Sequence, residues 1–335
     1  MMDAGAGSHA RMILPHAAED AMSTVLAIVV DPEAEGRLAL REVPAPVPGR
    51  DEAIVRLAAT SLNPGELRRV ASAAPGWRPG WDIAGWVEQP AADGSGPPAG
   101  ARVVGLLEAG AWAQRVAVPS RSLAALPDAV SFAQAATLPV AGLTALRALR
   151  RGGLLLGRRV LITGASGGVG HFACQLARLS GAHVVAAVRS AERAAAARES
   201  GAHEVIVGDP AAATQFAPYD LVLESVGGPW LAAALGMLAQ DGICVSFGTT
   251  ASPEVTFDAR RFYLTGGASL YGFILFYEVA RHPAGGDLAL LAGMVADGRL
   301  RPRIDLELPW TEIASAARQL AERRVTGKIV LHLPA

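Results

Sequence analysis

Short apolar stretches broken by turns fill the chain from Thr24 to about residue 141. Strand-like patterns are clearest in "TVLAIVV", "LALREVP", "EAIVRLAAT", "GWDIAGWVEQ", "ARVVGLL" and "AWAQRVAV". Clusters of Gly and Pro such as "ADGSGPPAG" separate these stretches, as is typical of strands joined by turns. The pattern predicts an all-β module of the kind that closes into a barrel.

The spacing of apolar residues becomes helical from about residue 128. Asp128 and Ser131 are the candidates to cap a first helix, and Pro139 is expected to separate it from a second. Beyond these helices come the apolar strands "RVLITG", "HVVAAV", "EVIVG", "DLVLESVG", "ICVSFG" and "SLYGFIL". Near-continuous apolar strands that alternate with helices predict a parallel, doubly wound sheet with helices on both faces.

The chain of 335 residues is too long for one ordinary hydrophobic core, so two domains are expected. We predict an α/β protein in which residues 24–141 and 277–335 form the β module and residues 142–276 form the doubly wound domain. Residues 277–335 supply helices and two short strands that are expected to return to the β module. Residues 1–23 lack the basic start and apolar core of a signal peptide and are expected to form a disordered extension.

Composition excludes several classes of function. The net charge of −1 offers no basic surface for nucleic acid, and no apolar run reaches the roughly 18 residues that a membrane span needs. The two cysteines, Cys174 and Cys244, exclude a disulfide framework and favour a reducing cytoplasm. A cytoplasmic protein that binds a small molecule is therefore expected.

A glycine-rich turn lies in "RRVLITGASGGVGHFACQLARLSGAHVVAAVRS", residues 158–190. Gly167 lets the backbone approach a pyrophosphate, and Gly170 lets the following helix pack closely on the strand. The N-terminus of that helix then offers unpaired N–H groups to the phosphates. A lone glycine pattern can be merely structural, but here the preceding strand, the helix and the second strand are all present, so the stretch predicts a nucleotide site.

The second strand of this unit ends without the usual acidic residue that binds the adenosine ribose. It ends Ala187-Val188-Arg189-Ser190, with Arg193 one turn later. An arginine at this position suits a 2′-phosphate and favours NADPH over NADH. The alternative is that Arg189 is a solvated loop residue.

The same glycine turn occurs in short-chain dehydrogenases, which also need a Tyr-x-x-x-Lys pair. The only lysine is Lys328, and Arg324 stands four positions before it. Tyr277 with Arg281 is the nearest imitation, but it lacks the lysine whose pKa can be lowered. The short-chain interpretation is therefore disfavoured.

From Thr24 to the C-terminus the chain instead resembles the medium-chain dehydrogenase/reductases. Within them it is most similar to the zinc-independent quinone oxidoreductase-like branch, which includes zeta-crystallin and enoyl reductases. The resemblance rests on motifs in a common order: "REVPAPVPGRDEAIVRLAATSLNPGE", "GWDIAGWV", "GARVVGL", "GAWAQRVAVP", "LPVAGLTAL", "VLITGASGGVG", "YDLVLESVGG" and "VTGKIVLHL". It implies a GroES-like barrel and a Rossmann domain around a cleft, in which NADPH delivers hydride to a quinone or an activated alkene. It also implies a homodimer through the last strand of the Rossmann sheet, at about residues 269–276.

No metal site is expected. A catalytic zinc takes three protein ligands from Cys, His or carboxylates, and residues 24–144 contain neither Cys nor His. The zinc-dependent branch draws its catalytic ligands largely from that domain, so this absence predicts a zinc-independent protein.

The resemblance implies a set of residues around the cofactor. Asn63 and Thr144 would line the nicotinamide side, although Asn63 can also be read as a turn residue ahead of Pro64. The pyrophosphate would be held by Gly164, Ala165, Ser166, Gly167, Gly168 and Val169, and the 2′-phosphate by Arg189, Ser190 and Arg193. The set is completed by Val226, Phe247, Gly248 and Thr249 at strand ends, and by Phe273 and Lys328; for Val226 and Phe273 ordinary core packing is the alternative.

The sequence does not identify the residue that would donate a proton to the substrate, because the chain departs from the family pattern at two positions. The family's Asn-x-x-Asp is Asn63-x-x-Glu66 here, and Arg68 stands where some relatives carry a tyrosine. Reduction of a quinone needs little help, whereas an enone requires a polarised carbonyl and a proton at its α-carbon. Weak candidates for the catalytic residue are Asn63, Arg68, Tyr263 and Tyr271, each of which can equally be packed or solvated.

The leading hypothesis is an NADPH-dependent reductase of quinones or α,β-unsaturated carbonyls. A dedicated tailoring enoyl reductase of secondary metabolism is the first alternative, and an NADPH-binding protein with little catalysis is the second. A flat, apolar small-molecule substrate is indicated by the aromatic residues Trp77, Trp81, Tyr271, Phe273, Phe276 and Tyr277.

Overall fold

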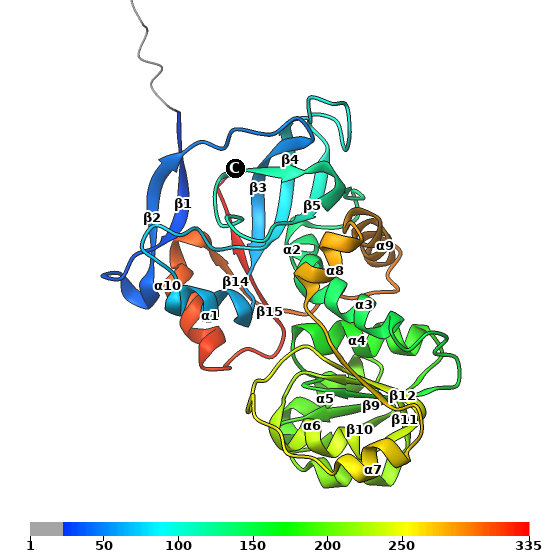
Figure 1. Ribbon diagram of the computed structural model, residues 1–335. Coiled ribbons are helices and arrows are strands. Elements are labelled where there is room, and N and C mark those ends of the chain that lie inside the picture. Colours follow the sequence, from blue (N-terminus) through cyan, green and yellow to red (C-terminus); the bar gives the residue numbers. More distant parts are fainter. Residues whose placement is uncertain (1–22, 335) are drawn as a thin grey trace, which may run out of the picture.

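The computed structural model describes residues 23–334, which form two lobes (Figure 1). The β lobe contains the strands of residues 24–125 and 304–332, and the parallel-sheet lobe contains those of residues 159–272. The extension expected at residues 1–23 lies, apart from Ser23, outside the described residues.

The β lobe is built on a seven-stranded sheet of order β14-β15-β3-β4-β5-β7, with β6 paired to β3, and on a separate β1-β2 pair. Its strands are β1 (Thr24–Val30), β2 (Leu38–Pro44), β3 (Glu52–Ser61), β4 (Asp82–Gln89), β5 (Arg102–Leu106), β6 (Arg115–Pro119), β7 (Leu123–Ala125), β14 (Ile304–Pro309) and β15 (Lys328–His332). Four α-helices accompany them: α1 (Pro64–Ser72), α2 (Phe132–Ala136), α9 (Gly285–Ala296) and α10 (Ile313–Ala321). As expected, the two tail strands return to this lobe, where β15 pairs antiparallel with β3.

The parallel-sheet lobe has six strands in the order β10-β9-β8-β11-β12-β13, all parallel. They are β8 (Arg159–Thr163), β9 (His183–Val188), β10 (Glu204–Val207), β11 (Tyr219–Glu224), β12 (Leu238–Ser246) and β13 (Ser269–Gly272). The helices are α3 (Leu143–Arg150), α4 (Gly168–Leu179), α5 (Ala194–Glu199), α6 (Gly228–Leu235), α7 (Ala259–Leu264) and α8 (Leu275–Arg281). The strand order runs outward in both directions from β8 and β11, so the sheet is doubly wound and the predicted α/β class is confirmed.

Successive residues of the central strand β8 pack against helices on opposite faces of the sheet. Val160 and Ile162 share a buried cluster with Phe172 of α4. Leu161 lies in a different cluster, with Leu231 of α6. Because side chains alternate across a strand, burial on both faces requires the continuous apolar runs seen in the sequence.

The connection between the lobes contains the two separate helices that were predicted around Pro139. The first, α2, ends at Ala136, and the interruption lies at Thr137, two residues before Pro139. Pro139 itself lies in the first turn of a π-helix, Leu138–Gly142, that leads into α3. Ser131 rather than Asp128 caps α2, since its side chain accepts from the backbone N–H of Gln134 at 3.1 Å. The stretch "SLYGFIL" is likewise only partly strand, because β13 ends at Gly272.

The helices of residues 23–334 include none with both the length and the apolar character of a membrane span.

Candidate functional site

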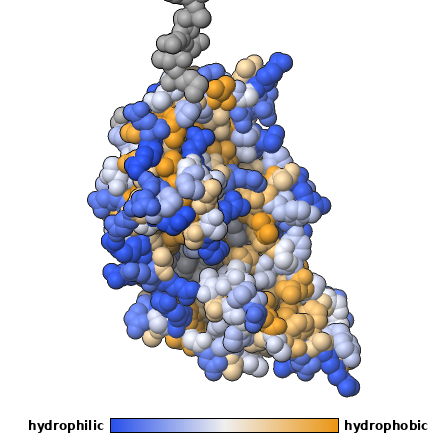
Figure 2. Space-filling view, turned by 60° about the vertical axis from the view of Figure 1, so that its left-hand side comes forward, coloured by the Kyte–Doolittle hydropathy of each residue, from blue (hydrophilic) through white to orange (hydrophobic). Residues whose placement is uncertain are grey.

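A cavity of about 500 Å³ lies between the lobes and takes residues from both. Figure 2 shows the recess between the upper and lower lobes on one face. The predicted cofactor residues that line the cavity are Asn63, Gly164, Ser166, Gly167, Gly168, Val169, Arg189, Arg193, Val226, Phe247 and Lys328. Lining residues that the sequence did not point to include Ser225, Trp230, Thr250, Arg323 and Thr326.

The glycine turn lies between β8 and α4, as predicted, and each glycine has its own steric reason. Gly164 has a φ of +60°, a conformation that other residues rarely adopt. A Cβ on Gly170 would lie 2.4 Å from the carbonyl oxygen of Gly164, so only glycine allows this close packing of helix on strand. A Cβ on Gly168 would lie 2.9 Å from Cδ of Lys328, which passes directly over the turn. The first N–H groups of α4 have no intrahelical acceptor and border the cavity, where they suit an anion.

The loop after β11 is held by a buried carboxyl that sequence reasoning missed. Glu224 accepts from the backbone N–H groups of Val226 at 2.7 Å and Gly227 at 3.0 Å. It also accepts from Oγ1 of Thr163 at 3.2 Å. Burial raises the pKa of Glu224. These bonds fix the loop whose residues Ser225 and Val226 line the cavity.

Three arginines that line the cavity lie close to one another. Arg189 and Arg193 follow β9, as the sequence indicated, and Arg323 comes from the β lobe. Arg193 donates to the carbonyl oxygen of Arg323 at 2.8 Å, and Arg323 donates to that of Thr250 at 2.6 Å. Burial first, and then the positive charges of Arg189 and Arg323, lower the pKa of Arg193. Such a concentration of guanidinium groups is a site for a phosphate.

A group of buried side chains, here called the polar cluster, reaches the cavity through Asn63 and Lys328. Its members are Ser61, Asn63, Glu66, Asp82 and Lys328. The Nζ of Lys328 donates to Oδ1 of Asn63 at 2.6 Å and to the carbonyl oxygen of Leu62 at 3.0 Å. It lies 3.4 Å from Oδ2 of Asp82. Asp82 is fully buried, so this ammonium is its counter-ion.

Asp82 also connects the two lobes. Its Oδ2 accepts from Nδ2 of Asn63 at 2.8 Å and from the hydroxyl of Ser61. Its Oδ1 accepts from the backbone N–H of Val140, in the π-helix that leads to α3, at 2.8 Å. One carboxylate therefore links β3, β4 and the connection between the lobes.

The side-chain amide of Asn63 is occupied within the protein. Its Oδ1 accepts from Lys328, and its Nδ2 donates to Asp82 and, at 3.3 Å, to Oε2 of Glu66. The same Oε2 accepts from the backbone N–H of Asn63 at 2.6 Å, which closes a capping box at the start of α1. Asn63 thus reaches the cavity with a fixed orientation and a single spare lone pair on Oδ1.

The remaining predicted cofactor residues do not line the cavity. Thr144, Ala165 and Phe273 are buried in the protein core, and Gly248 packs against the backbone of Ser225. Altogether, six predicted cofactor residues are absent from the cavity lining: Thr144, Ala165, Ser190, Gly248, Thr249 and Phe273. Their contact with a cofactor stays a prediction.

The candidate proton donors other than Asn63 also lie outside the cavity lining. Tyr271 donates its hydroxyl to Glu278, and the guanidinium of Arg151 lies 4.2 Å from the centre of its ring. The hydrogen bond to Glu278 raises the pKa of Tyr271. Tyr263 is 66% exposed on α7, and Arg68 is exposed on α1. The hydroxyl of Tyr271 is therefore already bonded within the protein, to Glu278, rather than directed into the cavity.

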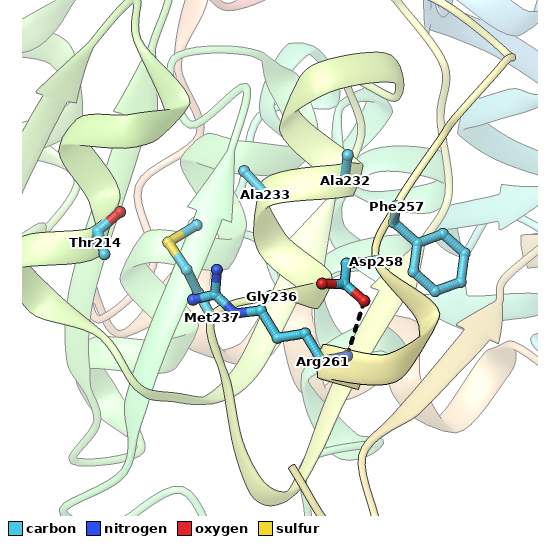
Figure 3. A pocket seen from close by; sticks show the side chains of 8 residues that line it. All are labelled: Thr214, Ala232, Ala233, Gly236, Met237, Phe257, Asp258 and Arg261. Carbon is cyan, nitrogen blue, oxygen red and sulfur yellow. Dashed lines mark hydrogen bonds between the residues drawn. The ribbon is translucent and has the colours of Figure 1, made fainter. Parts of the chain in front are cut away.

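A second, smaller pocket of about 170 Å³ lies in the parallel-sheet lobe (Figure 3). Arg261 of α7 reaches back alongside Met237, and its backbone N–H bonds to Asp258 at 3.0 Å. The pocket contains no residue of the glycine turn or the polar cluster. The interlobe cavity is therefore the candidate functional site.

Comparison with known proteins agrees with this geometry. Residues 49–128 match the family model "Alcohol dehydrogenase GroES-like domain", and residues 168–289 match "Zinc-binding dehydrogenase". The chain is 30% identical to the chloroplast envelope quinone oxidoreductase homolog of Arabidopsis thaliana, over 87% of this chain and 92% of that protein. It is 30% identical to prostaglandin reductase-3 of Bos taurus, over 88% and 84% of the two chains.

A solved structure of similar fold is the quinone oxidoreductase from Coxiella burnetii. It superposes with a TM-score of 0.78 at 25% identity, covering 93% of this chain and 100% of that one. The chain belongs to the medium-chain dehydrogenase/reductase superfamily, in its quinone oxidoreductase-like branch, and the predicted pair of GroES-like and Rossmann domains is confirmed.

The description of one family model mentions zinc, but residues 23–334 do not offer such an ion a set of ligands. Within residues 23–334 no three side chains from His, Cys, Asp and Glu come together as a metal site. In the polar cluster the available carboxyls are Glu66 and Asp82, and the ammonium of Lys328 already lies beside Asp82. A zinc ion would need three protein ligands and would have to compete with that ammonium.

The variant Lys328→Met should be strongly destabilised. It leaves Asp82 buried without a counter-ion, and loss of one partner of a buried pair typically costs about 3–5 kcal/mol. Urea unfolding monitored by fluorescence measures this free energy. The double variant Lys328→Met with Asp82→Asn should recover part of the loss, because a neutral amide needs no cation. A Lys328→Met variant as stable as the parent would contradict the assignment.

Proposed function

We propose that this protein is an NADPH-dependent reductase that transfers hydride to a quinone or an α,β-unsaturated carbonyl without zinc. The supporting observation is the layout of the interlobe cavity. One cavity is lined by Arg189, Arg193 and Arg323, by the glycine turn, and by Asn63 with Lys328. This combination suits a molecule that joins phosphates to a ring without a negative charge.

The residues of the chain would divide the binding of NADPH between them. Arg189, Arg193 and Arg323 would hold the 2′-phosphate, and the first N–H groups of α4 would hold the pyrophosphate. The nicotinamide would then lie toward Asn63 and Lys328. Bound NADPH would supply the hydride, and the protein would supply orientation and shelter from water.

The acceptor class is inferred from the relatives and from the cavity. Relatives of this chain are called quinone oxidoreductase or prostaglandin reductase, which supports a conjugated carbonyl acceptor. Trp230 and Phe247 line the cavity and suit a flat, apolar molecule. A reduced quinone can take its proton from water, so this acceptor needs no fixed acid.

The purified protein should oxidise NADPH in the presence of an ortho-quinone or a simple enone, and much more slowly with NADH. The absorbance of the reduced cofactor at steady state measures this, with a blank that lacks acceptor. Turnover should survive prolonged treatment with a zinc chelator, because no chain ligands for zinc are required. Loss of turnover on chelation would contradict the zinc-independent reaction.

Other outcomes of the same assay would replace the proposal. Tight NADPH binding with no turnover on small acceptors would favour a dedicated tailoring enoyl reductase with a larger substrate. The absence of turnover on a broad panel of larger enoyl compounds would favour a binding protein with little catalysis.

Arg189→Ala should raise the Kd for NADPH by about tenfold or more, the value of one charge-assisted phosphate contact, and leave the Kd for NADH unchanged. Fluorescence titration of each cofactor measures both constants. Arg158→Ala is the matched control, because Arg158 pairs with Asp220 at the start of β8 and is remote from the cavity. An equal loss for both cofactors would show that Arg189 does not read the 2′-phosphate.

We also infer that the protein is a homodimer that pairs through β13. This strand is at the edge of the parallel sheet, and Leu270 on it is 47% exposed. The segments that precede and follow β13 in the sequence carry further exposed apolar side chains: Tyr263, Leu264, Ile274 and Tyr277. An uncovered apolar strand edge is a surface for pairing with another copy.

Leu270→Asp should shift the protein to monomers, because charges would face each other across the paired edges. Sedimentation velocity measures the change, with Val47→Asp, at a fully exposed site of the β lobe, as control. A parent protein that sediments as a monomer would contradict the dimer.

A further inference from the structure

The polar cluster contains more acid than base. Glu66 and Asp82 are both 0% exposed, and the ammonium of Lys328 is the single cation among them, 5% exposed. With both carboxyls ionised the cluster would hold a net charge of −1 away from water. Such a charge is costly, and proteins usually avoid it by protonating one group.

The hydrogen bonds identify which carboxyl keeps the proton. Asp82 accepts from three neutral donors and from the ammonium, so neither of its two oxygens is left without a partner. Glu66 accepts through Oε2 only, whereas its Oε1 is buried and has no partner within the described residues. An ionised Glu66 would leave a charged oxygen bare, and therefore the proton lies on Oε1.

The charges that face Glu66 agree with this assignment. Burial is the largest influence that raises the pKa of Glu66, and the negative charge of Asp82 on β4 adds to it. Lys328 on β15 acts in the opposite direction and lowers the pKa, as do the backbone N–H groups of Asn63 and Trp81 to a smaller extent. On its own helix, α1, the neighbouring Arg68 and Arg69 are exposed to solvent.

We propose that Glu66 ionises when the oxidised cofactor occupies the cavity and stays protonated when the reduced cofactor does. This proposal rests on the proposed function, which brings the nicotinamide toward Asn63. The ring is neutral in NADPH and carries one positive charge in NADP⁺. Asn63 lines the cavity and bonds directly to Glu66, so the carboxyl is one hydrogen bond away from a residue of the cavity wall.

The step is a proton equilibrium linked to binding. The Oε1–H bond of Glu66 breaks, its electron pair stays on the carboxylate, and the proton passes to the solvent buffer. The polar cluster then carries −1 and compensates the positive ring. Because oxidised and reduced cofactor carry the same 2′-phosphate and face the same arginines, the titration of those groups cancels when the two are compared.

This linkage has a defined sign. Between the pKa of Glu66 with NADP⁺ bound and its raised pKa without it, binding of NADP⁺ releases a proton. The affinity for NADP⁺ should therefore increase with pH in that interval, by up to about tenfold per pH unit, relative to the affinity for NADPH. No acceptor substrate enters this relation, so it is measurable on binding alone.

The test is isothermal titration calorimetry of the full chain with NADP⁺ and with NADPH. Titrations at one pH in buffers of different ionisation enthalpy give the number of protons released, and a pH series gives the change in affinity. The parent should release up to about one proton more for NADP⁺ than for NADPH. Glu66→Gln, which copies the neutral acid in shape, should abolish the difference, while the exposed control Glu312→Gln should keep it.

Each outcome decides a different point. Equal proton release for both cofactors in the parent would overturn the role of Glu66, as would a difference that survives in Glu66→Gln. Failure of the parent to bind either cofactor would instead overturn the proposed function, and this inference with it. If Glu66→Gln does not fold, Glu66→Asp is the second variant. Its carboxyl lies one methylene further back and should have a different pKa, so the pH interval in which a proton is released should move.

Discussion

The ion pair between Lys328 and Asp82 is the interaction on which the arrangement of the cleft depends. Both groups are buried, so neither can be removed without leaving the other uncompensated. Lys328 holds the turn after β3 through Leu62 and Asn63, and Asp82 holds the connection to α3 through Val140. A single pair of charges thus joins the last strand of the chain, the centre of the β lobe and the start of the parallel-sheet lobe.

The same lysine explains part of the glycine pattern. Its aliphatic stem crosses the turn at Gly168, where a Cβ would displace it. Gly170 is required for the packing of α4 on β8, whereas Gly168 is required for the contact between the lobes. The turn that presents N–H groups to a phosphate is therefore also the surface on which the β lobe rests. Cofactor binding and lobe contact are constrained by the same few residues.

The fold was largely predictable because strand and helix periodicities are local properties of the sequence. The glycine turn and Arg189 were found for the same reason, since both belong to one strand-turn-helix-strand unit. The break fell two residues before Pro139, because proline is tolerated in the first turn of a helix, where its missing N–H would have had no intrahelical acceptor. Arg323 and Glu224 carried no local signal, because each acquires its position through contacts with segments remote in the sequence.

The proposed function separates binding energy from chemistry within one cavity. The three arginines would recognise a phosphate that takes no part in the reaction. The polar cluster, with Glu66 protonated, would have no net charge beside the ring that reacts. Strong binding remote from the reacting atoms can be used to position them, whereas a fixed charge next to the ring would stabilise one redox state over the other. A buried carboxyl that can change its charge avoids this conflict, because it can be neutral beside the neutral ring and negative beside the positive one.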